Sequence, residues 1–243
     1  GRGRNRNNML LGVVRERSSG ESRVALVPST LSQLAKAKIE VIVECGAGVA
    51  AGYSDALYSD AGAKLGTREE VFAQADLVCA VRCLGADPSN GPADLALLRT
   101  GQALVGMADP LSVPTAVADA AKTGASVFAL ELVPRITRAQ AMDVLSSQAN
   151  LAGYKAVLLG AVELPKLLPM MTTAAGTIPP ARALVVGAGV AGLQAIATAR
   201  RLGGVVSGYD VRPEVKTQIE SLGAKFVELP LEAGAGEGGY AKE

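Results

Sequence analysis

Three glycines between residues 187 and 192 give the clearest chemical signal in the sequence. Gly187-Ala188-Gly189-Val190-Ala191-Gly192 follows an apolar run and opens a helical pattern, a context in which G-x-G-x-x-G predicts a dinucleotide-binding turn. Gly187 allows the tight turn, Gly189 lets the backbone approach a pyrophosphate, and Gly192 lets the helix pack closely on the strand. The helix start, at Val190, favours the bound anion. The alternative is a glycine-rich turn that binds nothing.

Asp210 indicates which dinucleotide would be bound. It lies eighteen residues after Gly192, at the end of the next apolar run, where a carboxylate can accept hydrogen bonds from an adenosine ribose. A carboxylate there also repels a 2′-phosphate, which favours NAD over NADP. Arg212 points the other way, because an arginine near the strand end can hold a 2′-phosphate. We expect NAD, because Asp210 occupies the position that reads the ribose.

A second cluster of polar side chains lies between Arg135 and Asn150. Gln140, Asp143, Ser147 and Asn150 recur at i, i+3, i+7 and i+10, which is one face of a helix. Amide, hydroxyl and carboxylate groups together suit recognition of a polar planar group, such as a nicotinamide carboxamide. The alternative is a solvated helix face, although such faces are usually dominated by Lys and Glu.

The elements around these residues alternate between strand and helix over residues 9–132. The pattern predicts a parallel, doubly wound α/β sheet that is covered on both faces. The expected strands cover about 10–14, 39–44, 75–82, 102–107 and 126–131, and the expected helices cover about 28–38, 67–75 and 112–124. Thr67 is the expected cap of the second helix, and Gly124 is expected to close the third.

A long helix from about Thr137 to Leu168 is expected to join this region to a second Rossmann-like sheet, through a loop over 169–181. The expected strands at 182–187, 204–210 and 224–229 alternate along the chain with expected helices at 190–203 and 213–223. Three strands make half of a dinucleotide fold, so we expect the second domain to be truncated. The predicted organisation is a disordered leader (1–8), an N-terminal α/β domain (9–136), a connecting helix and loop (137–180) and the first half of a dinucleotide-binding domain (181–243).

Composition excludes several other functions. The formal net charge is +1, which gives no electrostatic reason to expect nucleic acid as a partner. No stretch approaches the roughly 18 apolar residues of a membrane span. The sequence contains no histidine and three cysteines without C-x-x-C spacing, so we expect no metal site.

Longer segments of the sequence resemble the alpha subunit of the proton-translocating NAD(P) transhydrogenase, a family related to alanine dehydrogenase. The similar segments are RVALVP (23–28), VECGAG (43–48), VPRITRAQAMDVLSSQANLAGYKAV (133–157), VVGAGVAGLQAIATARRLG (185–203), YDVRPEVKTQIESLGAKFVEL (209–229) and GYAKE (239–243). The resemblance covers nearly all of residues 9–243. It implies two Rossmann-like domains and NAD(H) binding on this chain.

The resemblance also implies roles for single residues. Arg135, Gln140, Asp143 and Ser146 match the loop and helix start that hold the nicotinamide end of the nucleotide, and Tyr240 matches a tyrosine of a mobile loop that closes over it. The implied protein is a homodimer at the cytoplasmic face of the membrane, or the matrix face in mitochondria. It would pass hydride to NADP(H) on a separate domain, while a membrane domain couples the transfer to proton movement.

Two other functions stay open. A soluble alanine dehydrogenase-like enzyme needs a proton acceptor, and the resemblance places a lysine and a histidine of those enzymes in the first domain. Here Arg82 stands at the expected lysine position and histidine is absent, so Arg23, which both branches share, is interpreted as structural. Hydride transfer between two nicotinamides needs positioning and exclusion of water instead. A non-catalytic NAD-binding module is the third possibility.

Overall fold

The chain divides into two compact units, residues Gly1–Pro134 and Arg135–Glu243. The computed structural model describes residues 9–229, and the two units are described separately below. The predicted leader at residues 1–8 and the predicted loop residue Tyr240 lie outside the described residues.

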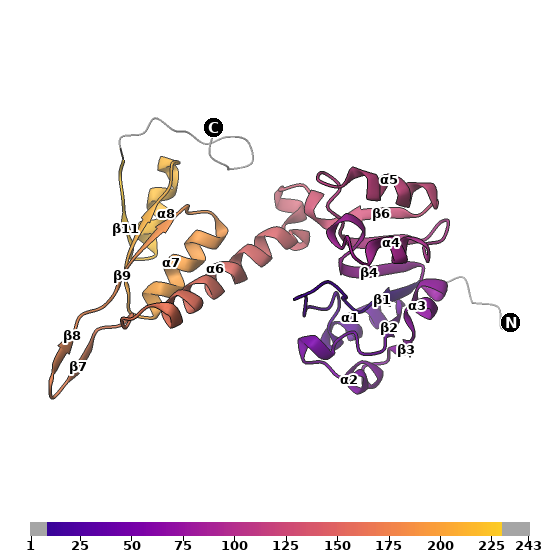
Figure 1. The fold of residues 1–243 in the computed structure, drawn as a ribbon, viewed down its shortest axis with the longest axis horizontal. Helices are drawn as coiled ribbons and strands as arrows, with labels where there is room; N and C mark the ends of the chain where they lie inside the picture. The colour runs from indigo at the N-terminus through magenta and orange to yellow at the C-terminus, as the bar shows by residue number, and fades with distance from the viewer. Residues whose placement is uncertain (1–8, 230–243) are drawn as a thin grey trace. The chain divides into compact units, whose positions relative to one another are not determined.

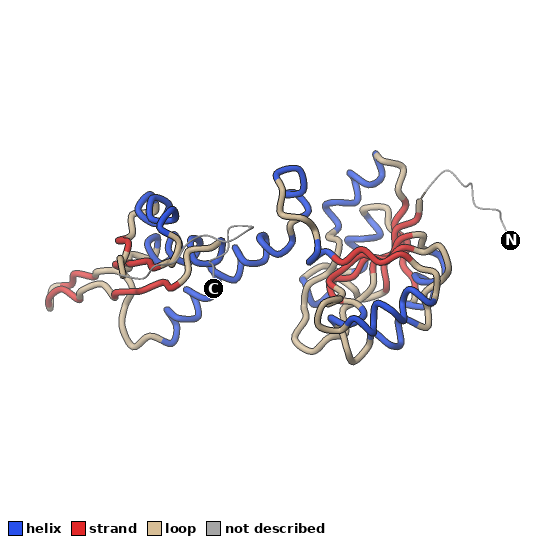
Figure 2. Tube along the Cα trace, turned by 90° about the horizontal axis from the view of Figure 1, so that it is seen from above, coloured by secondary structure: helices blue, strands red, loops and turns tan. Residues whose placement is uncertain are grey.

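The first unit is built on a six-stranded parallel sheet in the order β3-β2-β1-β4-β5-β6. The strands are β1 (Leu10–Val13), β2 (Glu40–Glu44), β3 (Lys64–Gly66), β4 (Leu77–Arg82), β5 (Ala103–Met107) and β6 (Ser126–Ala129). Figure 2 shows this sheet edge-on, with helices on both faces. The order changes direction beside β1, as in a doubly wound fold, so the predicted architecture is confirmed.

Both faces of this sheet are buried because successive strand residues point to opposite sides. In β1 and just after it, Leu10 and Val14 join one hydrophobic cluster, whereas Leu11 and Val13 join another. The helices that cover the sheet are α1 (Leu31–Lys36), α2 (Asp55–Asp60), α3 (Arg68–Gln74), α4 (Gly91–Leu95) and α5 (Pro114–Lys122), with 3₁₀ turns at Pro28–Thr30, Val49–Ala51, Leu84–Ala86 and Leu130–Leu132.

The start of α3 has two features, one predicted and one not. Thr67 and Glu70 form a reciprocal capping box, which confirms Thr67 as the cap. Arg68, the first residue of the helix, is buried and bonds Glu44 at the end of β2 and Asp94 in α4. This buried ionic network connects α3, β2 and α4, and it was not predicted from the sequence.

The second unit contains a three-stranded parallel sheet in the order β11-β10-β9, with the strands β9 (Arg182–Val186), β10 (Val205–Tyr209) and β11 (Lys225–Phe226). Its helices are α6 (Val144–Glu163), α7 (Val190–Arg201) and α8 (Lys216–Ser221), with 3₁₀ turns at Thr137–Met142 and Pro213–Val215. Ile196 of α7 and Ile219 of α8 are fully buried against Val206 of β10. The predicted strand–helix–strand–helix–strand order is confirmed.

Two sequence predictions about this unit were wrong. The helix expected from Thr137 to Leu168 is a 3₁₀ helix, Thr137–Met142, followed by α6, because the side chain of Asp143 caps the backbone amide of Ser146 and starts a new helix. The loop expected over 169–181 contains an antiparallel hairpin of β7 (Met171–Thr173) and β8 (Gly176–Ile178). Figure 1 shows the hairpin extending beyond the end of the sheet at which β9 begins.

Candidate functional site

A hollow of about 920 Å³ opens in the second unit where β9 ends and α7 begins. Strand β9 runs directly into the glycine-rich turn, and α7 starts at Val190 with Gly189 as its N-cap. The first amides of such a helix have no partner within the helix and carry the positive end of its dipole. The hollow therefore contains a helix start that suits an anion.

The three glycines of the turn have different environments. Gly187 has φ +88, a conformation that side chains other than hydrogen rarely allow. A Cβ on Gly192 would lie 1.8 Å from the carbonyl oxygen of Gly187, so only glycine lets the helix approach the turn this closely. A Cβ on Gly189 would meet no atom within 4 Å, so its open side is available to a ligand. The conformation of Gly187 and the close contact at Gly192 fit a tight turn and close helix packing, whereas the approach of a pyrophosphate to Gly189 stays a prediction.

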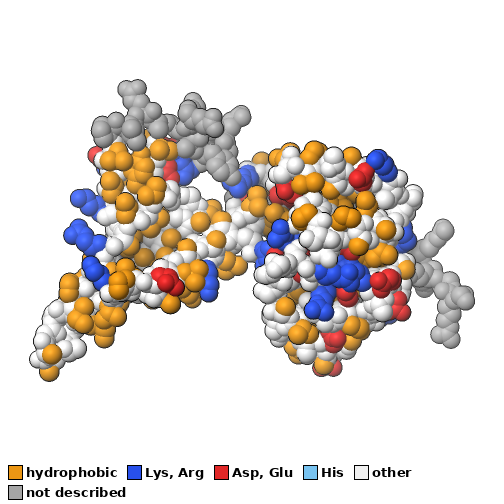
Figure 3. Space-filling view, in the orientation of Figure 1, with side chains coloured by type: hydrophobic (Ala, Val, Ile, Leu, Met, Phe, Trp, Pro, Cys, Tyr) orange, Lys and Arg blue, Asp and Glu red, His pale blue; other side chains and the backbone are white. Residues whose placement is uncertain are grey.

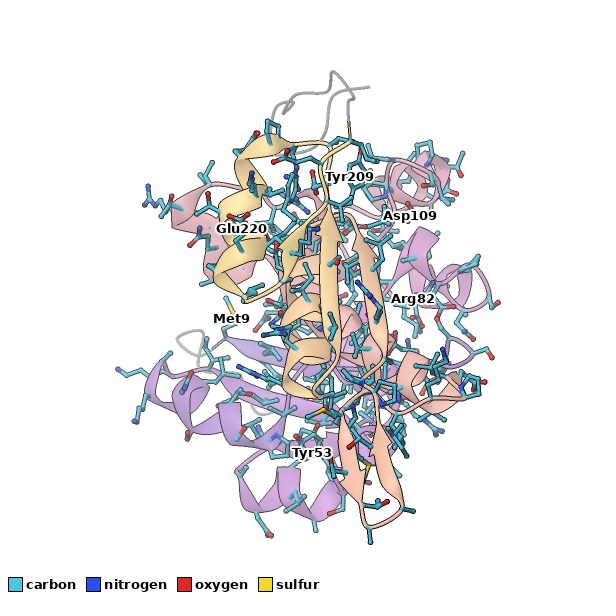
Figure 4. All side chains as sticks on the ribbon, turned by 90° about the vertical axis from the view of Figure 1, so that its left-hand side faces the viewer. Met9, Tyr53, Arg82, Asp109, Tyr209 and Glu220 are labelled. Atoms are coloured by element: carbon cyan, nitrogen blue, oxygen red, sulfur yellow. The ribbon has the colours of Figure 1, made fainter. Side chains whose placement is uncertain are left out.

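Asp210 closes the turn from the end of β10. Tyr209, labelled in Figure 4, is the last residue of that strand, and its carbonyl oxygen accepts a hydrogen bond from the amide of Gly187 at 2.8 Å. The Asp210 carboxylate accepts one from the amide of Ala188 at 2.7 Å. The ends of β9 and β10 are thus joined at the hollow.

Arg212 forms an ion pair with Asp210, in which its Nε donates to Oδ1 at 2.9 Å and its Nη2 donates to Oδ2 at 3.0 Å. These bonds lower the pKa of Asp210 to about 2, with the amides of Arg212 and Ala188 also contributing. Asp210 is therefore a buried carboxylate that stays ionised at neutral pH.

Eight of the residues predicted from the sequence line this hollow. They are Arg135, Ser146, Gly187, Gly189, Val190, Gly192, Asp210 and Arg212. Gln140 and Asp143 do not line it. Gln140 is exposed in the 3₁₀ helix, and Asp143 bonds the amide and hydroxyl of Ser146 at the start of α6. The Ser146 bonds lower the pKa of the Asp143 carboxyl.

The wall that α6 contributes to the hollow was not predicted from the sequence. Four small residues line it, namely Ala149, Ala152, Gly153 and Ala156. A Cβ on Gly153 would lie 2.1 Å from the carbonyl oxygen of Ala191, so this glycine sets how closely α6 approaches the first turn of α7. The signal was available in the sequence as small side chains spaced three and four residues apart along one predicted helix.

Comparisons with known proteins match both units. The model of the family described as "Alanine dehydrogenase/PNT, N-terminal domain" matches residues 12–152, and that of the corresponding C-terminal domain matches residues 156–238. The chain is 48% identical over 240 residues to an NAD(P) transhydrogenase alpha subunit of Rhodospirillum rubrum, covering 97% of this chain and 62% of that protein. It is 31% identical over 218 residues to the alanine dehydrogenase of Mycobacterium tuberculosis, covering 88% of this chain and 56% of that enzyme.

A solved structure is also similar to this chain along most of its length. The crystal structure of a transhydrogenase from Sinorhizobium meliloti has a TM-score of 0.85 and 46% sequence identity to this chain. The similarity covers 90% of this chain and 64% of that protein. The chain thus spans less than two thirds of the length of these transhydrogenase relatives.

Proposed function

This chain belongs to the alanine dehydrogenase/PNT family, and we propose that it is the NAD(H)-binding component of a proton-translocating NAD(P) transhydrogenase. It passes hydride between its own NAD(H) and NADP(H) held on another domain, and this transfer is coupled to proton movement across a membrane. The observation that carries the proposal is the hollow at the glycine-rich turn, which combines a helix start with the carboxylate of Asp210.

The residues around the hollow suit the successive parts of a dinucleotide. The pyrophosphate lies at the turn against Gly189 and Val190, and Asp210 reads the adenosine ribose. Arg135 and Ser146 line the same hollow and serve the nicotinamide end. Gln140 and Asp143 act just outside it, by orienting the nicotinamide and by holding Ser146 in place.

Transhydrogenation is favoured over amino-acid dehydrogenation by two observations. Identity to the transhydrogenase subunit is 48%, against 31% to alanine dehydrogenase. The sequence has no histidine, and the Nε of Arg82 donates a hydrogen bond to the carbonyl oxygen of Ala86. An arginine cannot serve as a proton acceptor at neutral pH, whereas hydride transfer between nicotinamides needs none.

The proposed partners are an NADP-binding domain, a membrane domain and a second copy of this chain, at the inner face of a membrane. No helix among residues 9–229 is both long enough and apolar enough to cross a membrane. The second copy is supported by apolar side chains exposed on α6 and the hairpin, which Figure 3 shows in orange. They include Leu151, Leu159 and Val162 of α6, and Met171 and Ile178 of the hairpin.

The test uses the full-length protein and its NADP-binding partner. We expect NADH to bind, and hydride to pass from NADH to NADP⁺ in a single-turnover stopped-flow measurement. Alanine-dependent reduction of NAD⁺ without hydride transfer to NADP⁺ would instead identify an amino-acid dehydrogenase. NADH binding without either reaction would leave a non-catalytic module.

A further inference from the structure

The Arg212 guanidinium is directed at a carboxylate of its own chain. Its Nε and Nη2 face the two oxygens of Asp210, and its side chain is only 15% exposed. Paired donors of this kind are also what arginine presents to phosphate groups. The same edge cannot serve both anions at once.

Both oxygens of the Asp210 carboxylate are also engaged in hydrogen bonds. Its Oδ1 accepts from the amide and Nε of Arg212, and its Oδ2 accepts from the amide of Ala188 and Nη2 of Arg212. A carboxylate has about four acceptor positions, so these four donors engage all of them. A ribose hydroxyl can replace one donor, whereas a 2′-phosphate would need the guanidinium itself.

We propose that Arg212 is a latent ligand for a 2′-phosphate, and that Asp210 excludes NADP(H) by withholding this guanidinium as well as by repulsion. This inference rests on the proposed function, because it assumes that the hollow binds a dinucleotide. Asp210 and Arg212 then set nucleotide choice as a pair. The pair explains how an arginine beside the ribose position is compatible with a site for NAD.

The experiment is a double-mutant cycle with Asp210→Asn, Arg212→Ala and the double variant. The ligands are 5′-ADP and 2′,5′-ADP, titrated by calorimetry into the full-length protein. The side-chain amide that Asp210→Asn introduces has one oxygen and one NH₂ group, whereas the Ala188 amide and the Arg212 guanidinium are both donors. Because the NH₂ group cannot accept from either of them, the substitution releases Arg212. We expect Asp210→Asn to bind 2′,5′-ADP about tenfold more tightly, the effect of gaining a charge-assisted hydrogen bond.

The two remaining variants separate withholding from repulsion. Arg212→Ala alone should change 2′,5′-ADP affinity by less than about twofold, and the double variant should lose most of the gain. Arg201→Ala is the matched control, because it removes an exposed guanidinium of the same unit that does not line the hollow. NADH titration of the parent protein tests the proposed function separately.

Three results would contradict the proposal that Asp210 withholds Arg212. An equal gain in the single and double variants would leave repulsion alone, and no gain in Asp210→Asn would remove both effects. The effect of removing Arg212 can also be compared in the two backgrounds. If Arg212→Ala weakens 2′,5′-ADP binding as much in the parent as in the Asp210→Asn variant, Arg212 is already available to the 2′-phosphate in the parent. If Asp210→Asn fails to fold, Asp210→Ser keeps an acceptor for the Ala188 amide without the charge, and the same outcomes apply.

Discussion

Single carboxylates act structurally in both units. Asp210 joins the glycine-rich turn to the end of β10, Asp143 starts α6, and Glu44 and Asp94 hold the buried Arg68. The sequence identified Asp210 and Asp143 as candidates for nucleotide binding, from their positions in motifs, and did not predict these structural bonds. It could not predict the pairing of Arg68, because its partners lie 24 and 26 residues away and only the folded sheet brings them together.

The Asp210–Arg212 pair should make stability depend on pH in acid. The pKa of Asp210 is lowered from 3.8 to about 2, so its contribution is fully present above pH 4 and is lost as pH falls towards 2. Its size is about 2 kcal/mol. Urea denaturation between pH 5 and pH 2.5 should therefore show a shallower decline in unfolding free energy for Arg212→Ala than for the parent. Arg201→Ala should keep the parental slope, and parallel curves for all three proteins would contradict the assignment.

Gln140 should matter for hydride transfer more than for binding. It does not line the hollow, so Gln140→Asn leaves the contacts of the turn and Asp210 unchanged. It shortens the reach of the amide by one methylene, and a displacement of about 1 Å in a reacting geometry can cost about 10²-fold in rate. We expect the single-turnover rate to fall by that order, with only a few-fold change in NADH affinity. Gln218→Asn, the same change at an exposed position on α8, is the control. An unchanged rate would indicate that Gln140 is part of a solvated surface and does not orient the nicotinamide.

At the scale of elements, most strands and helices of both sheets were predictable because buried parallel strands read as short apolar runs. Strand β3, helices α2 and α4, the break before α6 and the hairpin were not predicted. The spacing of polar residues between 137 and 150 is compatible with one helix, so the local N-cap signal of Asp143, three residues before Ser146, was not recognised as a break. The hairpin at 171–178 lacks alternating apolar residues and is held by backbone pairing between two short strands.

The contact between α6 and α7 should be sensitive to a single methyl group. In Gly153→Ala the new Cβ would lie 2.1 Å from a backbone oxygen of Ala191, so the helices must separate. Overpacking of this kind costs about 1–3 kcal/mol, and it should also weaken NADH binding because Gly153 and Ala191 both line the hollow. Gly160→Ala on the same helix meets no atom within 4 Å, and should stabilise the protein by about 0.5–1 kcal/mol. Urea denaturation measures both changes, and equal effects would contradict the close-packing argument.

At the scale of the whole molecule, each unit has its own hydrophobic core, and the hollow draws all its lining residues from the second unit. The sequence therefore predicted the fold of each unit from patterns local to it. It could not predict which surfaces remain uncovered, because that depends on how the elements of a unit pack. The apolar faces of α6 and the hairpin became visible only in the structure.

The hairpin offers the sharpest test of the proposed homodimer. Residues 167–181 contain no charged side chain, although exposed strand edges are usually protected by charge. Met171 and Ile178 pair across one face and are 46% and 47% exposed, whereas Thr172 and Thr177 meet on the other face, with their hydroxyl oxygens 3.2 Å apart. If the apolar face contacts a second copy, Ile178→Lys places a charge in that interface and should convert the dimer to a monomer in sedimentation velocity. Thr177→Lys adds the same charge to the opposite face and should remain dimeric. Dimers in both variants, or monomers in both, would show that this face does not mediate assembly.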